Sequence, residues 1–424
     1  MSDDYPFNSF NSFNSINVLN KSYNYYYYYL LCIKMVYQEA FELEQFMDDY
    51  ETKVDYNAAE TCCDSLTIKQ IEELSGNKFD YENEVLNKKL SYGDIRGSPS
   101  LLNTLTEFYT EGNDSKNEYG AKINPADFVI TNGAIGANFL TLYALVGPGD
   151  HVIVIDPIYF QLQSTPKMFG AEVDILNLKF ENDFEIDVAA IAKLVKSNTK
   201  LIIINSPHNP SGIFLTDDKL LQIVDVAKQH GIYILCDEVY RPLYHSVPIE
   251  ENPRSIVNLY EKGISTGSLS KAFAAAGTRL GWVVSKDQEF IKQCYIRRDY
   301  NIISVSLLSD SIANYILQNR KSVLKRNYEL CQNNLKILDD FITKNSKYLS
   351  YVKPKSGTTA FVKVSSNGKF TTLDMCLELI KDYKVLFVPG ETFGHPGFIR
   401  VGYANSEINL IKGLESLQLF LDNH

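Results

Sequence analysis

The sequence has little basic charge, few histidines and no apolar run near its start that is long enough to cross a membrane. Its 41 Lys and Arg residues stand against 52 Asp and Glu residues, a net charge of −11. The basic surface expected of a nucleic-acid-binding protein is therefore missing. The six histidines never stand at metal-ligand spacing with a second His or a Cys, so we expect no metal site. The apolar run 30–33 is far shorter than the roughly 20 residues of a membrane span, so we expect no membrane partner.

Paired cysteines and targeting signals are also missing. The cysteines, an odd set without a CxxC pair, are Cys32, Cys62, Cys63, Cys236, Cys294, Cys331 and Cys376. Scattered single cysteines favour reduced thiols in the cytosol. No arginine precedes Arg96, contrary to a mitochondrial presequence, and Asp3 and Asp4 stand where a secretory signal would be basic. We therefore expect a cytoplasmic protein.

Residues 1–34 differ from the rest of the chain. They repeat Asn, Ser, Phe and Tyr, as in FNSFNSFNSINVLN and SYNYYYYY, a composition that cannot bury a core of its own. We expect this segment to be dispensable, either because Met35 is the true start or because it is a disordered tail of the native chain. The remainder has a globular composition, with 45% hydrophobic and 22% charged residues over the full 424.

Apolar, β-branched runs alternate with helical stretches in the middle of the chain. The runs are FVITNG (128–133), HVIVIDP (151–157), AEVDILNL (171–178), KLIIINSP (200–207), IYILCDEV (232–239), ISTGSLS (264–270) and LGWVVS (280–285). Apolar strands separated by helices indicate an α/β fold with a mainly parallel sheet of about seven strands between helices. One of these helices is predicted over 217–231, between an N-capping Thr216 and a terminal Gly231.

The pattern changes from residue 304 onward. A long helical run extends to residue 344, strand-like pieces follow at 359–364 and 398–404, and a last helix begins at Ser406. This arrangement predicts a second, smaller α+β domain.

Polar residues follow the ends of several predicted strands. They are Pro157–Tyr159, Asn209, Asp237 with Tyr240, and Ser268 with Lys271. Ligands bind outside the carboxyl ends of strands in open α/β sheets, so we expect these residues to converge on one crevice. Any one of them alone also suits a simple turn.

Lys271 is the most informative of these residues. It stands in GSLSKAFAAAGTRLGW, between an apolar strand and an Ala-rich turn. Its stem can lie along the surface with the ammonium in water. Alternatively, a desolvated lysine loses its proton easily and becomes a nucleophile for carbonyl groups.

This segment resembles the S-x-S-K motif, with Arg eight residues later, of fold-type I pyridoxal-phosphate-dependent aminotransferases of class I/II. The resemblance runs from about residue 39 to the C-terminus. It implies pyridoxal 5′-phosphate as cofactor, held by Lys271 as a Schiff base. It also implies an N-terminal arm and part of a small domain over 35–90, a large cofactor-binding domain over 91–303 and the rest of the small domain over 304–424.

Two further motifs resemble the parts of the family that hold the cofactor ring. NSPHNPSG (205–212) is similar to N-P-x-N-P-[ST]-G, although Ser206 departs from it, and this implies that Asn209 binds the phenolic oxygen. CDEVY (236–240) is similar to D-E-x-Y, which implies that Asp237 keeps the pyridine nitrogen protonated and that Tyr240 joins Asn209. Asp237 alone also suits a helix cap.

A third motif resembles the phosphate site of the family. TNGAIG (131–136) follows a strand and opens a helical stretch, so its free N–H groups can bind an anion. The implied phosphate ligands are Gly133, Ala134, Ile135, Ser268, Ser270 and Arg279. Tyr159 matches the aromatic residue that stacks on the cofactor ring. Tyr92, in LSYGDIRG, matches a tyrosine that reaches the phosphate of a neighbouring subunit, which implies a homodimer with shared active sites.

The substrate side has fewer signals. FIRVGYA (398–404) resembles the segment whose arginine, here Arg400, binds the substrate carboxylate through a two-bond fork, and Asn209 is expected to border the substrate. DYNAAE (55–60) resembles the G-L-A-E-N stretch of 1-aminocyclopropane-1-carboxylate synthases, and capreomycidine-synthase-like members are similar here. Thr61 replaces the Asn and the Gly is absent, so Glu60 equally suits a solvated charge.

The resemblance implies an enzyme that converts an amino acid into a keto acid, an aminotransferase in which Lys271, Asp237 and Tyr240 are catalytic. A lyase or cyclase acting by β- or γ-elimination or ring closure stays open. A nicotinamide oxidoreductase would share the sheet, but no G-x-G-x-x-G follows any strand. A non-catalytic binding module of the same family would be expected to lack Lys271 or Asp237, and both are present.

Overall fold

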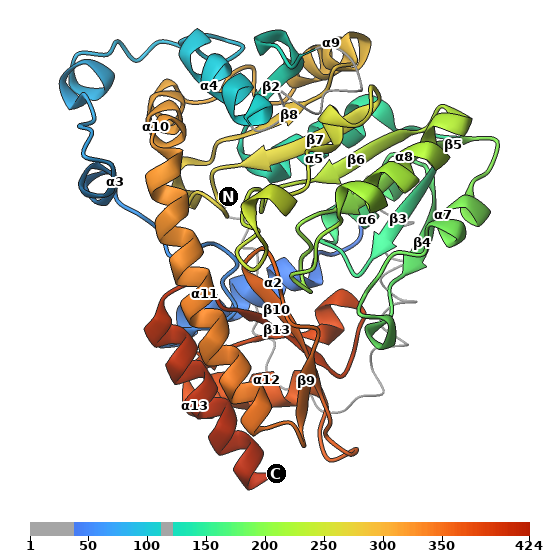
Figure 1. Ribbon diagram of the computed structural model, residues 1–424, viewed down its shortest axis with the longest axis vertical. Coiled ribbons are helices and arrows are strands. Elements are labelled where there is room, and N and C mark those ends of the chain that lie inside the picture. The colour runs from blue at the N-terminus through green and yellow to red at the C-terminus, as the bar shows by residue number, and fades with distance from the viewer. Residues whose placement is uncertain (1–37, 112–121) are drawn as a thin grey trace, which may run out of the picture. The chain divides into compact units, whose positions relative to one another are not determined.

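The computed structural model describes residues 38–111 and 122–424. Residues 40–424 form one unit, drawn in Figure 1. The expectations for residues 1–34 lie outside the described residues and stay predictions. No helix in the described part of the chain is long and apolar enough to cross a bilayer.

A seven-stranded sheet carries the site, in the order β2-β8-β7-β6-β5-β3-β4. The strands are β2 (Phe128–Thr131), β3 (His151–Asp156), β4 (Glu172–Asn177), β5 (Thr199–Asn205), β6 (Tyr233–Asp237), β7 (Gly263–Ser268) and β8 (Gly281–Val284). β8 runs antiparallel to β2 and β7, and every other neighbouring pair is parallel. The strands coincide with the seven apolar runs, so the mainly parallel sheet is confirmed.

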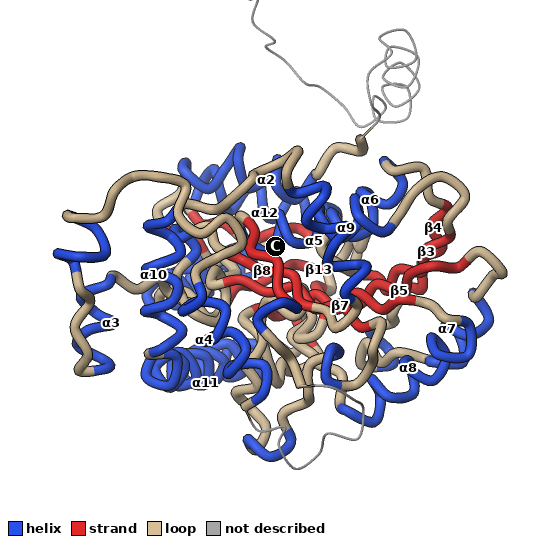
Figure 2. Tube along the Cα trace, turned by 90° about the horizontal axis from the view of Figure 1, so that it is seen from above, coloured by secondary structure: helices blue, strands red, loops and turns tan. Residues whose placement is uncertain are grey.

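Helices cover both faces of this sheet. Figure 2 shows α5 (Gly133–Leu145), α6 (Gln161–Met168) and α9 (Gln288–Arg298) on one side, and α7 (Val188–Leu194) and α8 (Asp217–His230) on the other. Side chains on a strand alternate between faces, and β3 therefore supplies two separate hydrophobic clusters. Val152 and Val154 join one, with residues of α5 and α9, and Ile153 and Ile155 join the other, with residues of α7 and α8.

The helix predicted over 217–231 is confirmed to within one residue at its end. The Thr216 side chain accepts a hydrogen bond from the Lys219 N–H, and Gly231 ends the helix with φ +67°. Glycine suits this left-handed position because it has no Cβ to clash with the backbone.

A second, smaller sheet contains β12 (Val388–Pro389), β13 (Phe398–Gly402), β10 (Thr359–Val364) and β9 (Leu349–Tyr351), all antiparallel. Near it, β1 (Tyr56–Asn57) pairs in parallel with β11 (Val385–Leu386), which joins the N-terminal part to the C-terminal part. The remaining α-helices of the described residues are α2 (Glu42–Tyr50), α3 (Ile68–Ser75), α4 (Pro99–Thr110), α10 (Leu307–Gln318), α11 (Arg320–Lys344), α12 (Thr372–Tyr383) and α13 (Glu407–Asn423). The predicted smaller α+β part is confirmed.

The single helical run predicted over 304–344 is wrong in one respect, because it divides into α10 and α11 at Asn319. The Asn319 side-chain amide donates to the Tyr315 carbonyl at 2.8 Å and accepts from the Asn77 amide at 2.6 Å. Asn competes with regular helical bonding in this way, and it has φ −98° and ψ 13° here.

A close approach between β8 and α5 positions one end of the site. A Cβ built on Gly281 would lie 2.3 Å from the carbonyl carbon of Gly133. Only glycine lets β8 and the first turn of α5 come this close. The N-terminus of α5 is thereby set beside the end of the sheet.

Candidate active site

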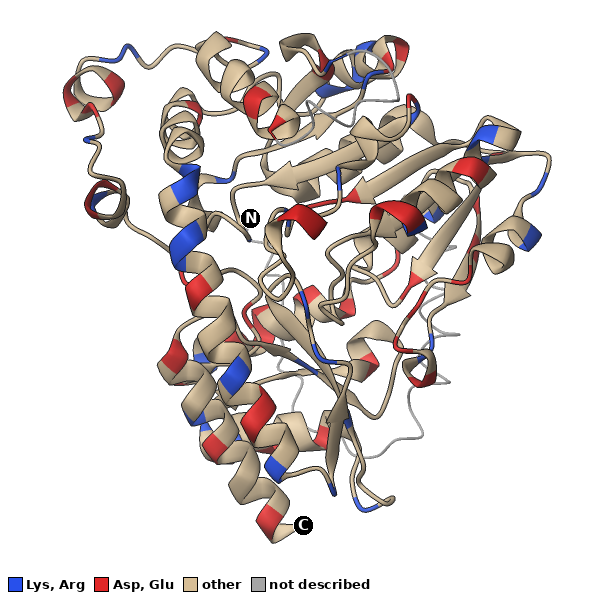
Figure 3. Ribbon diagram, in the orientation of Figure 1, with Lys and Arg blue, Asp and Glu red and all other residues tan. Residues whose placement is uncertain are grey.

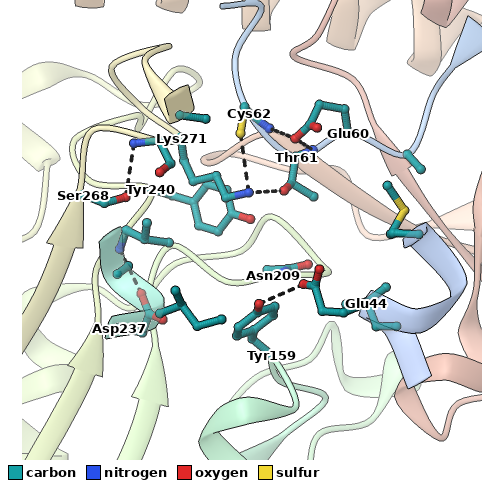
Figure 4. A pocket seen from close by; sticks show the side chains of 18 of the residues that line it. Glu44, Glu60, Thr61, Cys62, Tyr159, Asn209, Asp237, Tyr240, Ser268 and Lys271 are labelled. Carbon is teal, nitrogen blue, oxygen red and sulfur yellow. Dashed lines mark hydrogen bonds between the residues drawn. The ribbon is translucent and has the colours of Figure 1, made fainter. Parts of the chain in front are cut away.

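A cavity of about 330 Å³ opens at the carboxyl ends of β5, β6 and β7. Residues of α2, the segment 59–62 and β13 close it from the other side (Figure 4). Its lining includes the sequence-predicted residues Glu60, Ala134, Ile135, Tyr159, Asn209, Asp237, Tyr240, Ser268, Ser270, Lys271, Arg279 and Arg400. The structure brings these twelve residues together, and their roles stay predictions.

Lys271 projects into the cavity just after β7. Its ammonium donates a hydrogen bond to the Thr61 hydroxyl and lies 3.6 Å from the Cys62 sulfur. Burial lowers the pKa of Lys271, but Cys62, Tyr240 and Glu60 act in the opposite direction, and the pKa ends above its ordinary value. The expectation of an easily deprotonated lysine is therefore wrong for this arrangement. The physical reason is that Cys62, Tyr240 and the Glu60 carboxylate together favour the ammonium by more than burial disfavours it.

Asp237 ends β6 with 4% of its surface exposed. One carboxylate oxygen accepts from the Asn138 amide at 2.8 Å, and the other accepts from the Val239 N–H at 3.1 Å. The Asn138 amide oxygen in turn accepts from the Thr266 hydroxyl at 2.7 Å. Burial raises the pKa of Asp237 to about 6 in spite of these hydrogen bonds. The group is therefore a buried carboxylate at neutral pH whose charge favours a cationic partner.

Asn209 and Tyr240 lie on the same side of the cavity, in the loops after β5 and β6. The Asn209 N–H donates to the Asn205 side-chain oxygen at 2.7 Å, and the Asn205 amide donates to the Asp237 carbonyl at 2.8 Å. These bonds fix the Asn209 backbone, while its own side-chain oxygen is buried with no partner among the described residues. Burial raises the pKa of Tyr240, so its phenol is neutral. Both side chains are available to a polar ligand.

The N-terminus of α5 and Arg279 lie close together in the lining of the cavity. Ala134 and Ile135 line it directly, and Gly133 lies beside Arg279, whose Nη2 would be 3.1 Å from a Cβ at that glycine. The first N–H groups of a helix have no partner within it, so they attract an anion. Ser268 and Ser270 also line the cavity, and the Ser268 hydroxyl accepts from the Ser270 N–H at 3.1 Å.

Tyr159 forms part of the wall opposite Lys271. Its hydroxyl donates to the Glu44 carboxylate of α2 at 2.8 Å, and its ring contacts Phe41 with centroids 4.8 Å apart. Burial raises the pKa of Tyr159, so the phenol stays neutral. These two contacts fix the plane of the ring, as a flat stacking surface requires.

Arg400 and Glu60 line the cavity close to each other. Arg400 is 4% exposed, and its guanidinium donates to the Ala59 carbonyl at 3.1 Å, while its Nε has no partner among the described residues. Glu60 accepts from the Thr61 and Cys62 N–H groups at 2.7 and 2.8 Å. Burial raises the pKa of Glu60, but nearby Lys271 and these N–H groups outweigh burial and lower it. Glu60 is therefore a carboxylate.

Tyr92 does not line the cavity of its own chain. It is 70% exposed and borders a separate surface hollow with Leu90 and Leu307. Its predicted contact across a subunit boundary stays a prediction.

Sequence reasoning missed several residues that line the site, among them Glu44, Asp48, Glu51, Thr61, Cys62 and Asn138. Asn138 had a signal, because it is a buried amide on the otherwise apolar helix GAIGANFLTLYAL. Glu44 belongs to a repeat of acidic residues on one helix face. Thr61 and Cys62 had no signal in the sequence, because only the folding of the N-terminal segment onto the large sheet brings them to Lys271.

Comparisons with known proteins show which family this chain resembles. The family model for aminotransferase class I and II matches residues 76–416. A PLP-dependent aminotransferase from Streptococcus suis is similar at 36% identity, with a TM-score of 0.84 over 91% of this chain and 98% of that one. The aspartate aminotransferase of Thermotoga maritima is 26% identical over 79% of this chain and 84% of its own. The capreomycidine synthase of Streptomyces vinaceus is 27% identical over 79% of this chain and 87% of its own.

The pKa of Asp237 leads to a testable dependence of stability on pH. In the unfolded chain this carboxyl group ionises near its ordinary 3.8, whereas in the folded, ligand-free protein it ionises at about 6. Between these values the folded protein holds a proton that the unfolded chain has lost, so the free energy of unfolding falls as pH rises. Replacing Asp237 by Asn removes this loss. We expect Asp237→Asn to be more stable than wild type at pH 8 by up to about 3 kcal/mol.

This gain should shrink as pH falls, become small near pH 4, and vanish only below about pH 3, where both states of wild type hold the proton. Urea unfolding of the ligand-free proteins at pH 4, 6 and 8 measures it, with exposed Asp49→Asn on α2 as the control. A stability difference between Asp237→Asn and wild type that is independent of pH would contradict the assigned pKa.

Proposed function

This chain belongs to the class I and II aminotransferases, which are pyridoxal 5′-phosphate-dependent enzymes, and we propose that Lys271 carries its chemistry in the cavity described above. The observation that supports this most directly is that the Lys271 ammonium, the Asp237 carboxylate and the N-terminus of α5 line one cavity. An amine, an acidic partner for a ring nitrogen and a phosphate site are the three groups that this cofactor needs.

The residues present fit the cofactor. The buried side-chain amide of Asn209, whose oxygen has no partner among the described residues, can turn its NH2 group to donate to a polar ring substituent. Arg279 forms no ion pair with a carboxylate among the described residues, and it lies beside Gly133, where a Cβ would crowd its guanidinium. A phosphate would find this cation together with the free N–H groups of α5.

Each side chain then has a defined task. The bound cofactor supplies an electron-withdrawing ring that acidifies the α-proton of an amino acid attached to it. Arg400 binds the α-carboxylate of that amino acid, and Asp237 holds a proton on the ring nitrogen. Tyr240 and Asn209 hydrogen-bond the phenolic oxygen. The Lys271 amine, once it has lost its extra proton, would be the base that takes the proton from Cα of the substrate.

The substrates are an amino acid and a keto acid, as the family implies, and we propose that this chain transfers the amino group between them. Glu60 supports a second candidate, elimination or ring closure. Its carboxylate lines the cavity and stabilises the Lys271 ammonium, and one similar protein is named capreomycidine synthase. A carboxylate in this place can act on the substrate after its α-proton has left.

One experiment separates these candidates. We expect an amino acid alone to convert the enzyme-bound cofactor to its amine form in a single turnover, and a keto acid to restore the original absorption spectrum. Glu60→Gln should change this half-reaction by less than about tenfold, because Glu60 contacts no reacting atom in simple transfer. Spectra and product masses, with and without a keto acid, measure both. Continuous turnover without any keto acid, lost in Glu60→Gln, would instead establish the lyase or cyclase.

We also propose a homodimer in which Tyr92 completes the site of the neighbouring subunit. Tyr92 is 70% exposed, and nearby in sequence Leu86 and Leu90 are 72% and 81% exposed. Exposed apolar side chains of this kind commonly mark a protein contact. The large domain over 91–303 and the small domain over 35–90 and 304–424 stay our proposed division. The six described cysteines are all free, which supports a cytoplasmic setting.

Mixed subunits test the sharing of Tyr92. Tyr92→Ala should weaken phosphate binding without unfolding the subunit, because the side chain is exposed in the single chain. Lys271→Ala should abolish turnover. A mixed dimer contains one site with both native residues, so random exchange should restore roughly a quarter of wild-type activity. Mass spectrometry of the intact dimers confirms the exchange. Confirmed mixed dimers without activity would contradict the shared site.

A further inference from the structure

A stripe of carboxylates lines the mouth of the cavity. Glu44 and Asp48 lie on α2 and Glu51 follows in the next turn, at spacings of four and three residues, so they share one helix face. All three line the cavity, together with Glu60. α2 contains no Lys or Arg, and Figure 3 shows its acidic residues without blue neighbours on the helix.

Glu44, Asp48 and Glu60 repel the carboxylate of Glu51. Burial raises the pKa of Glu51, and the charges of Glu60, Asp48 and Glu44 raise it further. Like charges four residues apart on a helix also destabilise it. None of the four forms an ion pair with a Lys, Arg or His among the described residues. A cation placed between them would relieve this repulsion.

The cations that line the cavity already have other tasks. They are Lys271, Arg279 and Arg400, facing five lining carboxylates when Asp237 is counted. Arg400 is only 4% exposed, and its Nε has no hydrogen-bond partner among the described residues. This independent feature points to a bound carboxylate and so fixes where the α-carboxylate of a substrate lies.

The carboxylates extend from this anchor toward the mouth. Glu60 and Glu44 are near enough to raise the pKa of Arg400, against its lowering by burial. Glu51 in turn is near enough to Glu60, Asp48 and Glu44 to have its own pKa raised. A side chain that leaves the anchored Cα toward the opening therefore passes along negative charge.

We propose that the cavity selects an amino acid whose side chain ends in a cation, an ammonium or a guanidinium, and that Asp48 and Glu51 determine this specificity. The proposal rests on the proposed function, since it assumes that the α-carboxylate binds at Arg400. The same carboxylates disfavour a dicarboxylic amino acid, whose second carboxylate would meet like charge. No lining arginine is left to bind that group.

Matched substrates test the charge alone. L-lysine and L-norleucine differ by the terminal ammonium, and L-arginine and L-citrulline differ by charge at nearly equal shape. In single-turnover spectra of the holoenzyme we expect kcat/KM to favour the charged member of at least one pair by roughly 30-fold. This preference should fall as salt rises, because the charges at the mouth are partly exposed.

The double variant Asp48→Asn/Glu51→Gln is the test of the residues. It should reduce the preference to below about threefold by slowing the charged substrate, with norleucine and citrulline unchanged. Asp49→Asn is the matched control, because Asp49 neighbours Asp48 on α2 and does not line the cavity. Glu44 is left intact because it holds the Tyr159 hydroxyl.

The outcomes separate this proposal from the proposed function. Three results would overturn the cationic selection and leave amino transfer standing. They are equal rates for the charged and neutral members of each substrate pair, a preference for L-aspartate or L-glutamate, and a preference for charged substrates that the double variant retains. No spectral change with any amino acid, in a protein that holds the cofactor, would overturn the proposed function, and the cationic selection with it.

Discussion

The buried carboxylate of Asp237 is the constraint on which the rest of the site depends. A charge this far from water is unfavourable unless something compensates it, and burial raises its pKa to about 6. The Asn138 amide and the Val239 N–H compensate only in part. A cationic ring nitrogen would complete the compensation, so the fold holds a charge whose partner is the ligand.

The same logic applies around the cavity. Arg400 is a buried guanidinium without a carboxylate partner among the described residues, Asn209 has an unpartnered oxygen, and the first N–H groups of α5 face the cavity. Each is costly alone and suits one charged or polar part of an amino acid joined to the cofactor. The unliganded site is therefore prepared at the expense of stability. Lys271 differs from these groups, because Glu60 stabilises its ammonium in the unliganded site.

The sequence predicted the parts of the molecule in which local pattern and final structure agree. Seven apolar runs became the seven strands, and Thr216 and Gly231 bounded α8, because burial and capping act within a few residues. The break at Asn319 was missed because its amide bonds Asn77, far away in the chain. Thr61 and Cys62 reach Lys271 only after the N-terminal segment folds over the sheet. The ammonium state of Lys271 depends on that same packing and was predicted wrongly.

Covalent attachment at Lys271 is the central claim, and reduction of the holoenzyme tests it most directly. Borohydride treatment followed by proteolysis and peptide mass spectrometry locates the lysine that carries the cofactor. The account predicts one labelled peptide, which contains Lys271, and loss of the label when an amino acid substrate is added before reduction. A label on another lysine, or none in a protein that retains its cofactor spectrum, would contradict it.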